Sequence, residues 1–182
     1  MLILAICVTG IFCAVSCGAR AGDPLAYRTQ PFKADISGNI TSTTGGRVDF
    51  SATLEFFEYA EDGSREFLML FHAPEALSGL SVRSLPDGGI TFSLDGMTFS
   101  LRNREAVGGF IKIAEMLDPS EEVLRISSIP GASAGLAGFS YLTLIETATQ
   151  KIYVDPHTSY PVKAEFSGGE IEICFETVTC RT

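Results

Sequence analysis

The sequence predicts a mainly β protein, namely a curved, incomplete antiparallel barrel of about ten strands with one or two helices as a lid. The first observation is the stretch 67–101, where alternating apolar runs are separated by turn-forming pairs: Ala73-Pro74, Asp87-Gly88 and Asp95-Gly96. Asp-Gly between such runs is typical of a hairpin, because glycine readily takes the positive φ of a tight turn. Apolar and polar residues alternate, which predicts one apolar and one solvent-facing side of the sheet.

The second observation is that similar runs occur on both sides of this stretch. They predict further strands at residues 33–42, 47–59, 139–146, 151–155, 160–166 and 170–177. Between the two groups, residues 105–117 carry apolar side chains at helical spacing. Asp118-Pro119 then predicts the start of a second short helix ending near Ile126, followed by a Gly/Ala/Ser loop over 127–138.

The third observation is that the predicted helix at 105–117 is too small to cover the apolar side of the predicted sheet. A helix of about 13 residues is some 20 Å long, which is too short to cover the apolar side of ten strands. A long twisted antiparallel sheet tends to curl, so we expect this sheet to fold over its own apolar side and leave a hollow under the helix. The alternative is a barrel or sandwich whose aromatic side chains simply fill the core.

Composition limits the classes of partner. The chain has 182 residues, a formal net charge of −9, 46% hydrophobic residues and no tryptophan. This is enough for one domain with a real core. The acidic balance disfavours nucleic acid and an electrostatic hold on anionic headgroups. We expect a monomer.

The N-terminus predicts an export signal and a lipid anchor. Residues 1–16 carry no charge and are followed at once by Cys17. Sixteen residues suit the apolar part of a secretory signal but are shorter than the roughly 20 that span a bilayer. Residues 14–17 (Ala-Val-Ser-Cys) resemble the lipobox of bacterial lipoproteins, which implies lipidation of Cys17 and attachment to the cell membrane or outer membrane on its extracytoplasmic side. A short unlipidated signal or an N-terminal core strand is the alternative.

The predicted organisation is therefore a signal peptide at 1–16, a flexible tether at 17–31 and one domain at 32–182. After processing, Cys174 and Cys180 are the cysteines left in the domain. Six residues of extended strand separate α-carbons by roughly 20 Å, and no Gly or Pro lies between these two. We expect free thiols here, with a disulfide as the alternative.

Residues 152–165 resemble the strand–turn–strand of the LolA-like lipoprotein-carrier superfamily. Asp155, Thr158 and Pro161 match that pattern, while Ser159 and Tyr160 stand where Gly-Leu is usual. The order of hairpins, meander, helix, loop and hairpins over residues 31–177 is also similar. The resemblance implies a half-barrel with a helical lid over an apolar cavity, which holds acyl chains or a partner's hydrophobic segment.

On this basis the candidate ligand-binding residues are the large apolar side chains of the meander and the helix. They are Phe50, Phe67, Met69, Phe71, Phe92, Met97, Phe99, Phe110 and Ile111. The alternative function is that of a structural or regulatory envelope lipoprotein, whose hollow is filled by its own side chains and which acts through protein contacts.

No catalytic motif fits its required context, so we expect neither enzyme activity nor a cofactor. Residues 131–135 match the pattern G-x-S-x-G, but Pro130 precedes them and a predicted strand follows, whereas a nucleophile elbow lies between a strand and a helix. A small-residue loop is the better interpretation. His72 and His157 are the two histidines, and no Cys/His cluster predicts a metal site.

Overall fold

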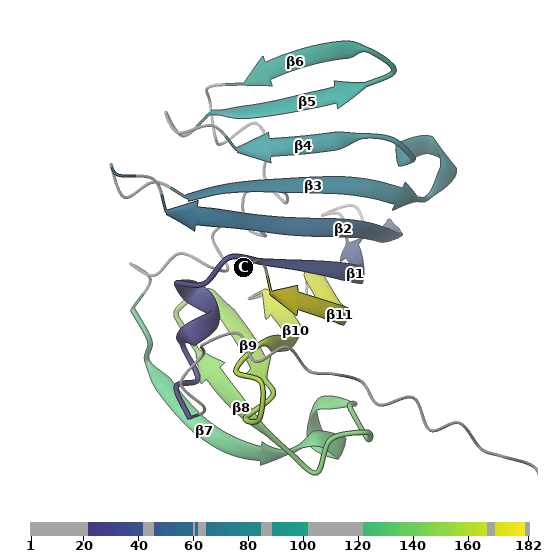
Figure 1. Cartoon of the computed structure of the whole chain (residues 1–182). Coiled ribbons are helices and arrows are strands. Elements are labelled where there is room, and N and C mark those ends of the chain that lie inside the picture. The colour runs from purple at the N-terminus through teal and green to yellow at the C-terminus, as the bar shows by residue number, and fades with distance from the viewer. Residues whose placement is uncertain are drawn as a thin grey trace, which may run out of the picture.

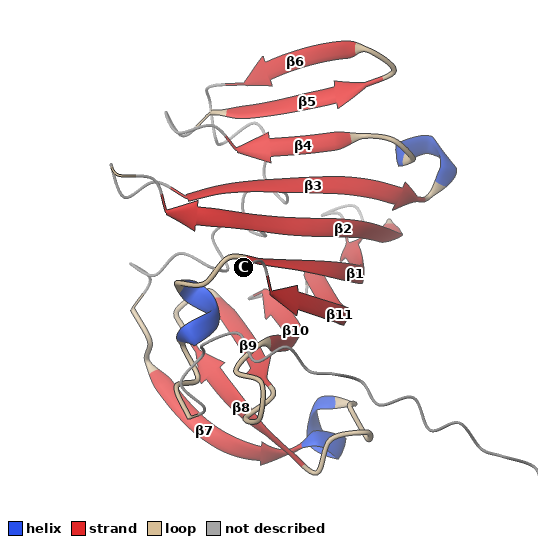
Figure 2. Ribbon diagram, in the orientation of Figure 1, coloured by secondary structure: helices blue, strands red, loops and turns tan. Residues whose placement is uncertain are grey.

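A computed structural model describes residues 22–41, 46–59, 61, 65–84, 89–101, 122–166 and 170–180. They form a single 11-stranded antiparallel sheet in the order β6-β5-β4-β3-β2-β1-β11-β10-β9-β8-β7 (Figures 1 and 2). The strands are β1 (Phe32–Thr41), β2 (Arg47–Tyr59), β3 (Arg65–Ala73), β4 (Ser81–Ser84), β5 (Ile90–Leu94), β6 (Met97–Leu101), β7 (Arg125–Pro130), β8 (Tyr141–Glu146), β9 (Gln150–Val154), β10 (Pro161–Phe166) and β11 (Ile171–Cys180). The described helical elements are 3-10 turns: η1 (Ala26–Arg28), η2 (Glu75–Leu77) and η4 (Gly131–Ala134).

The first and last strands, β1 and β11, pair in the middle of the sheet. The two edges of the described sheet are therefore β6 and β7, which follow one another in the strand sequence. Figure 1 shows β7–β10 turned steeply relative to β1–β6, so the sheet is curved and open. The predicted incomplete antiparallel barrel is confirmed.

One face of the sheet, here called the inner face, holds the main core. Leu54 and Met69 from one half belong to the same buried cluster as Ile145 and Ile152 from the other half. All four side chains are 0% exposed. The sheet therefore curls over its own apolar face, as the mismatch between sheet and helix predicted.

The opposite face of β7–β10, part of the outer face, has a smaller cluster of its own. Ala134 of η4 packs with Leu142 and Tyr153, and Leu136 and Phe139 lie at its border. The segment 131–140 thus covers this part of the outer face.

Two predicted elements are wrong. The second helix does not extend to Ile126, because residues 122–124 have no regular structure and Arg125 begins strand β7. The predicted loop begins only at Gly131, because Ser127–Pro130 pair with β8. The helix predicted at 105–117, together with residues 118–121, lies outside the described residues.

Part of the region predicted as a tether is folded. Within the described part of it, Ala26, Tyr27 and Arg28 form η1 and are buried, with Tyr27 0% exposed. A large aromatic ring is stabilised by packing against the sheet rather than by remaining in solvent. This segment is therefore part of the domain and not a free linker.

The two cysteines lie on one continuous strand. Cys174 pairs with Ser37 and with Lys163, and Cys180 pairs with Phe32. Cys174 is a free thiol. Extended backbone between the two positions separates them far beyond disulfide distance, so the expected free thiol at Cys174 is confirmed.

Candidate apolar binding face

The register of β1–β6 aligns apolar side chains into rows that cross the inner face. Each strand contributes one residue to a row, because directly paired residues point to the same side of an antiparallel sheet. The central row runs Ala34, Leu54, Met69, Val82, Phe92 and Phe99.

Burial changes along this row. The first four side chains are at most 1% exposed, Phe92 is half-buried, and Phe99 is 61% exposed. The two flanking positions on β6, Met97 and Leu101, are 57% and 41% exposed. The inner face is thus filled at its centre and exposed toward β6, and we call Phe92, Met97, Phe99 and Leu101 the β6 margin. At the opposite edge Ile126, which pairs with the buried Ile145, is 48% exposed.

The candidate ligand-binding residues divide between these two regions. Phe50, Phe67, Met69 and Phe71 are at most 4% exposed. Their partners are other core residues: Phe50 and Phe71 have ring centroids 5.7 Å apart. Phe92, Met97 and Phe99 lie in the β6 margin. Phe110 and Ile111 lie outside the described residues, as does Cys17.

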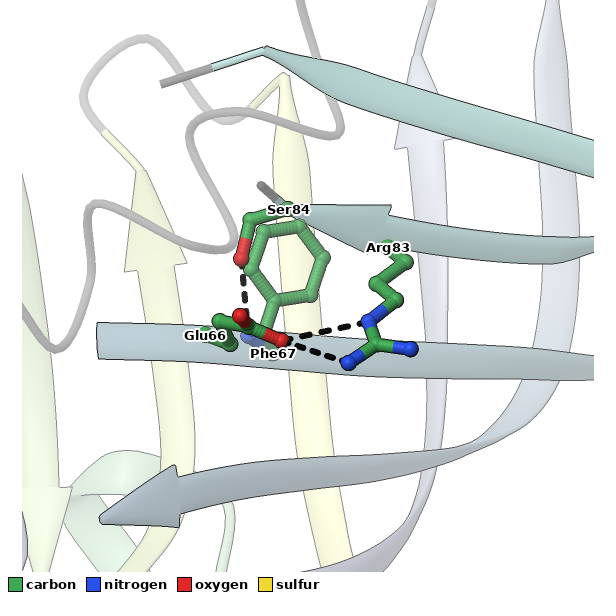
Figure 3. Close-up of polar contacts among 4 residues, drawn as sticks. All are labelled: Glu66, Phe67, Arg83 and Ser84. Atoms are coloured by element: carbon green, nitrogen blue, oxygen red, sulfur yellow. Dashed lines mark hydrogen bonds and ion pairs between the residues drawn. The ribbon is translucent and has the colours of Figure 1, made fainter. Parts of the chain in front are cut away.

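The change from filled centre to margin falls near β4, the short strand Ser81–Ser84. Its end is tied to β3 by side chains as well as by the backbone (Figure 3). The Ser84 hydroxyl accepts a hydrogen bond from the Phe67 backbone N–H at 2.8 Å. Arg83 donates to Oε2 of Glu66 at 3.2 and 2.7 Å. These contacts join the end of β4 to β3, and β4 in turn pairs with β5, the strand that carries Phe92.

The N-terminal segment covers part of the centre and is held by Arg65 at the start of β3. The Arg65 guanidinium donates to the carbonyl of Phe57 at 3.0 Å and to the carbonyl of Arg28 at 2.6 Å. It also donates to the carbonyl of Gln30. Its carbon lies 5.2 Å from the centroid of the Phe56 ring. Sequence reasoning missed this role, since no pattern marks an arginine that binds main-chain carbonyls.

Tyr160 joins the same segment to the β9–β10 turn. Its hydroxyl donates to Oε1 of Gln30 at 3.2 Å, and its ring packs edge-on against Phe32 with centroids 5.6 Å apart. Burial raises the pKa of Tyr160, while the positive charge of Arg65 acts in the opposite direction. A position where leucine is usual in the superfamily pattern thus has a polar contact with the N-terminal segment.

The β9–β10 turn itself is organised by Asp155. Its carboxylate accepts from the backbone N–H of His157 at 2.9 Å and from the Thr158 hydroxyl at 3.1 Å. Ser159 has φ of 60°, in the left-handed region that favours glycine. Glycine would adopt this backbone conformation without steric strain.

A charged cluster lies on the outer face of β9–β11. Lys163 Nζ lies 2.8 Å from Glu165 and 3.1 Å from Glu172, and it donates to the carbonyl of Ala134 at 3.3 Å. Tyr153 donates to Glu165 at 3.1 Å. Burial, reinforced by the Glu165 carboxylate, raises the pKa of Tyr153 to about 12. The cluster pins the covering segment 131–140 to the sheet.

Two further pKa shifts accompany this cluster. Burial lowers the pKa of Lys163, but its hydrogen bonds to Glu165 and Glu172 raise it more, so the net direction is upward. Burial and the nearby Glu172 carboxylate raise the pKa of the Cys174 thiol. A raised pKa disfavours the thiolate, so Cys174 is not activated as a nucleophile.

The G-x-S-x-G match is a turn. Residues 131–134 form η4, and a Cβ on Gly131 would collide with the carbonyl oxygen of Phe139. Gly135 has φ of 75° and ends the turn. Both glycines are required by backbone geometry, as the small-residue interpretation predicted.

His72 takes part in a separate hydrogen-bonded group. His72 Nε2 lies 2.8 Å from the Thr53 hydroxyl, which donates to Asp35 at 2.9 Å. In a catalytic triad the carboxylate orients the histidine, whereas here it binds the hydroxyl. The three side chains form an exposed hydrogen-bonded chain on the outer face.

Sites for other chemistry are not evident in the described part of the chain. Within those residues no group of three or more His, Cys, Asp and Glu side chains is arranged to hold a metal ion. A search of the same residues finds no helix with the length and apolarity needed to cross a bilayer.

Comparison with known proteins defines the fold class. The structure is similar to a putative outer membrane lipoprotein-sorting protein domain from Vibrio parahaemolyticus, with 11% identity, a TM-score of 0.50, and coverage of 89% of this chain and 91% of that chain. It also matches a LolA superfamily protein from Nitrosomonas europaea, with 9% identity, a TM-score of 0.47, and coverage of 89% and 91%. No family model and no curated protein matches the sequence.

The fold is LolA-like, as the resemblance of residues 152–165 predicted. At 11% identity the match to the Vibrio domain establishes the fold alone.

Proposed function

We propose that this protein is an envelope lipoprotein, anchored through Cys17 on the extracytoplasmic side of the cell membrane or outer membrane, which binds an apolar segment on the β6 margin. The segment is an acyl chain or a hydrophobic stretch of a lipoprotein or peptide. The protein binds this ligand without catalysis or cofactor.

The observation that carries the proposal is the exposure of three large apolar side chains, Met97, Phe99 and Leu101, on one strand beside the filled centre of the inner face. Neighbouring large apolar side chains at a surface mark interaction sites more often than single ones do. The half-buried Phe92 continues this surface toward the core. A ligand on the margin removes these side chains from water without requiring the core to open.

The fold supports the same class of function. The Vibrio parahaemolyticus domain with this fold is described as a putative lipoprotein-sorting domain of the outer membrane. An envelope location and an apolar ligand agree with the predicted signal at 1–16 and with the acidic composition, which gives little attraction for nucleic acid.

The alternative function, protein contact by a self-filled domain, has one observation in its favour. Phe50, Phe67, Met69 and Phe71 are all buried against other core residues. Under that alternative the margin meets a protein partner and takes up no free lipid.

Uptake of a fluorescent fatty-acid probe by the delipidated full-length protein distinguishes these functions. Phe99→Ser is expected to weaken probe binding by about tenfold, because a largely exposed ring that becomes buried contributes roughly 1–2 kcal/mol. Tyr141→Ser is the matched control, since Tyr141 is 64% exposed on β8 at the other end of the sheet. Equal binding by both variants, or no uptake by the parent, contradicts the proposal.

The anchor is tested separately by metabolic acyl labelling. Cys17→Ala is expected to abolish the label and to release the chain or stop its processing, because one residue carries the lipid. An unlabelled parent that still partitions into the membrane contradicts lipidation at Cys17.

A further inference from the structure

The two edges of the described sheet, β6 and β7, differ in sequence. An edge strand presents unpaired backbone N–H and C=O groups, and charged residues or proline usually prevent another chain from pairing there. Edge β7 begins with Arg125, which lies 3.9 Å from Glu146, and ends with Pro130. Edge β6 carries neither charge nor proline, and all five of its residues are exposed.

The hairpin that ends in β6 determines which backbone groups are available. Asp95 and Gly96 have φ of 49° and 78°, as in a two-residue type I′ turn. Such a turn makes Leu94 and Met97 a hydrogen-bonded pair, and bonded and non-bonded pairs then alternate along the ladder. The N–H and C=O groups of Thr98 and Ser100 therefore point away from β5, where the described residues provide no further strand.

The side chains of β6 are symmetric about Phe99. The sequence Met-Thr-Phe-Ser-Leu has an apolar residue at each end, a hydroxyl residue on each side of the centre, and a ring in the middle. We propose that β6 pairs antiparallel with β6 of a second copy of this chain about a two-fold axis at Phe99. Met97 then lies opposite Leu101 of the second copy, Thr98 opposite Ser100, and Phe99 opposite Phe99.

This pairing repeats contacts that the structure already contains. In the β5–β6 ladder Phe92 is paired with Phe99, and the hydroxyls of Ser93 and Thr98 lie 3.1 Å apart. Thr91 and Ser100 form a similar pair at 3.3 Å. The two-fold pairing places the same residue types opposite each other. Aromatic and hydroxyl pairs of this kind are favourable across strands.

Charge also favours this edge over others. Two copies of a chain with net charge −9 repel each other over most of their surfaces. The strands β5 and β6 contain no charged residue, so they can approach without placing like charges opposite one another. At a two-fold axis normal to the sheet, the inner faces of both copies lie on the same side. The two β6 margins then form one continuous apolar surface.

The inferred dimer differs from the monomer expected from the sequence. It does not depend on ligand binding, because it is formed by the edge of the strand rather than by its inner face. A chain that takes up the fatty-acid probe as a single copy would overturn the dimer and leave the proposed function intact.

Sedimentation equilibrium of the full-length protein in density-matched detergent tests the dimer. The parent and Ser100→Ala are expected to have twice the mass of one chain. Ser100→Pro is expected to have half that mass, because proline removes the outward N–H of Ser100 and leaves the β5–β6 hydrogen bonds in place. A parent of single-chain mass at every concentration overturns the inference.

Cross-linking gives a second test that does not require a proline. A Phe99→Cys chain is expected to form a disulfide-linked pair on mild oxidation, because non-hydrogen-bonded partners have their side chains close together. The parent, with its native cysteines, and Ile126→Cys on edge β7 are the controls and should remain uncross-linked. Equal cross-linking of all three chains, no linked pair from the Phe99→Cys chain, or a link to a different protein overturns the proposal.

Discussion

Two strand pairs of this sheet share a sequence pattern and differ in their surroundings. In β2–β3 the paired residues Leu54 and Met69 are both 0% exposed. In β5–β6 the paired residues are Phe92, which is half-buried, and Phe99, which is 61% exposed. Alternation determines which side of a strand is apolar, whereas segments distant in the chain determine whether that side is covered.

The cover of the centre comes from two directions. The curled strands β8–β11 supply part of the core, and residues 25–30 supply another part that includes the fully buried Tyr27. Arg65 and Tyr160 fasten the second cover to the sheet. The difference between centre and margin is therefore a difference in cover, and it can be tested by changing either region.

The largest expected effect comes from removing equivalent rings in the two regions. Phe71→Ala is expected to lower the free energy of unfolding by about 3–5 kcal/mol, because the lost ring leaves a cavity in packed surroundings. Phe99→Ala should change it by about 0.5 kcal/mol or less, since its ring is mostly in solvent. Urea denaturation of both variants measures the difference, and equal losses would contradict the contrast.

The next effect concerns the fastening of the N-terminal cover. Arg65→Met should lower the free energy of unfolding by about 2–3 kcal/mol, because three main-chain carbonyls lose a charged donor. Arg83→Met is the control, since its exposed ion pair with Glu66 contributes about 0–1 kcal/mol. Limited proteolysis should then cut Arg65→Met within residues 22–31 faster than the parent. Unchanged cutting would show that Arg65 does not hold this segment.

A smaller effect concerns the outer face, where Tyr153 lies against Glu165. The folded state raises the pKa of Tyr153 from 10.0 to about 12, so the folded protein holds this proton more tightly than the unfolded chain does. The resulting stability is complete below pH 10 and is lost as pH rises toward 12, by about 1 kcal/mol after allowance for solvent screening. In Tyr153→Phe, which has no hydroxyl to titrate, the free energy of unfolding should not show this loss between pH 10 and 12. Parallel melting-temperature curves for parent and variant over pH 9–12 would contradict it.

The smallest effect is a gain at the turn that carries Tyr160. Ser159→Gly is expected to raise the free energy of unfolding by about 0.5–1 kcal/mol, because glycine adopts the observed φ of 60° without steric strain. Thermal denaturation measures the gain. A loss of stability would indicate that Ser159 contributes a contact that outweighs its backbone strain.

The strands could be predicted because alternation and turn residues are local signals. Asp95-Gly96 forms the expected turn, and strands that follow one another across a predicted turn, such as β5 and β6, are neighbours in the sheet. Strand β7 was missed because Asp118-Pro119 favours a helix start, and because Ile126 and Ile129 are three residues apart and so do not alternate as in a half-buried strand. Residues 125–130 form a strand because they pair with β8, a contact that the local sequence does not indicate.

The candidate site could be predicted only in part for the same reason. Leu68 and Leu70 distinguish the run around Phe71 from the run around Phe99 and indicate a central strand, but neither run shows which distant segments cover its ring. Burial of Tyr27 depends on contacts with strands far along the chain, and residues 18–31 are mostly small or polar, as in a linker. The asymmetry of the two edges, by contrast, was readable from Arg125, Pro130 and the uncharged run 97–101 once the strand order was known.

The most direct test is to locate the residues to which a bound apolar ligand attaches. Their position shows whether the ligand binds at the β6 margin or in the core. A photoactivatable fatty acid can be bound to the full-length protein, cross-linked by light and located by peptide mass spectrometry. We predict attachment to residues 92–101, with Phe99→Ser reducing the yield and Tyr141→Ser leaving it unchanged. Attachment centred on residues 67–71, or the same yield from both variants, would contradict binding at the β6 margin.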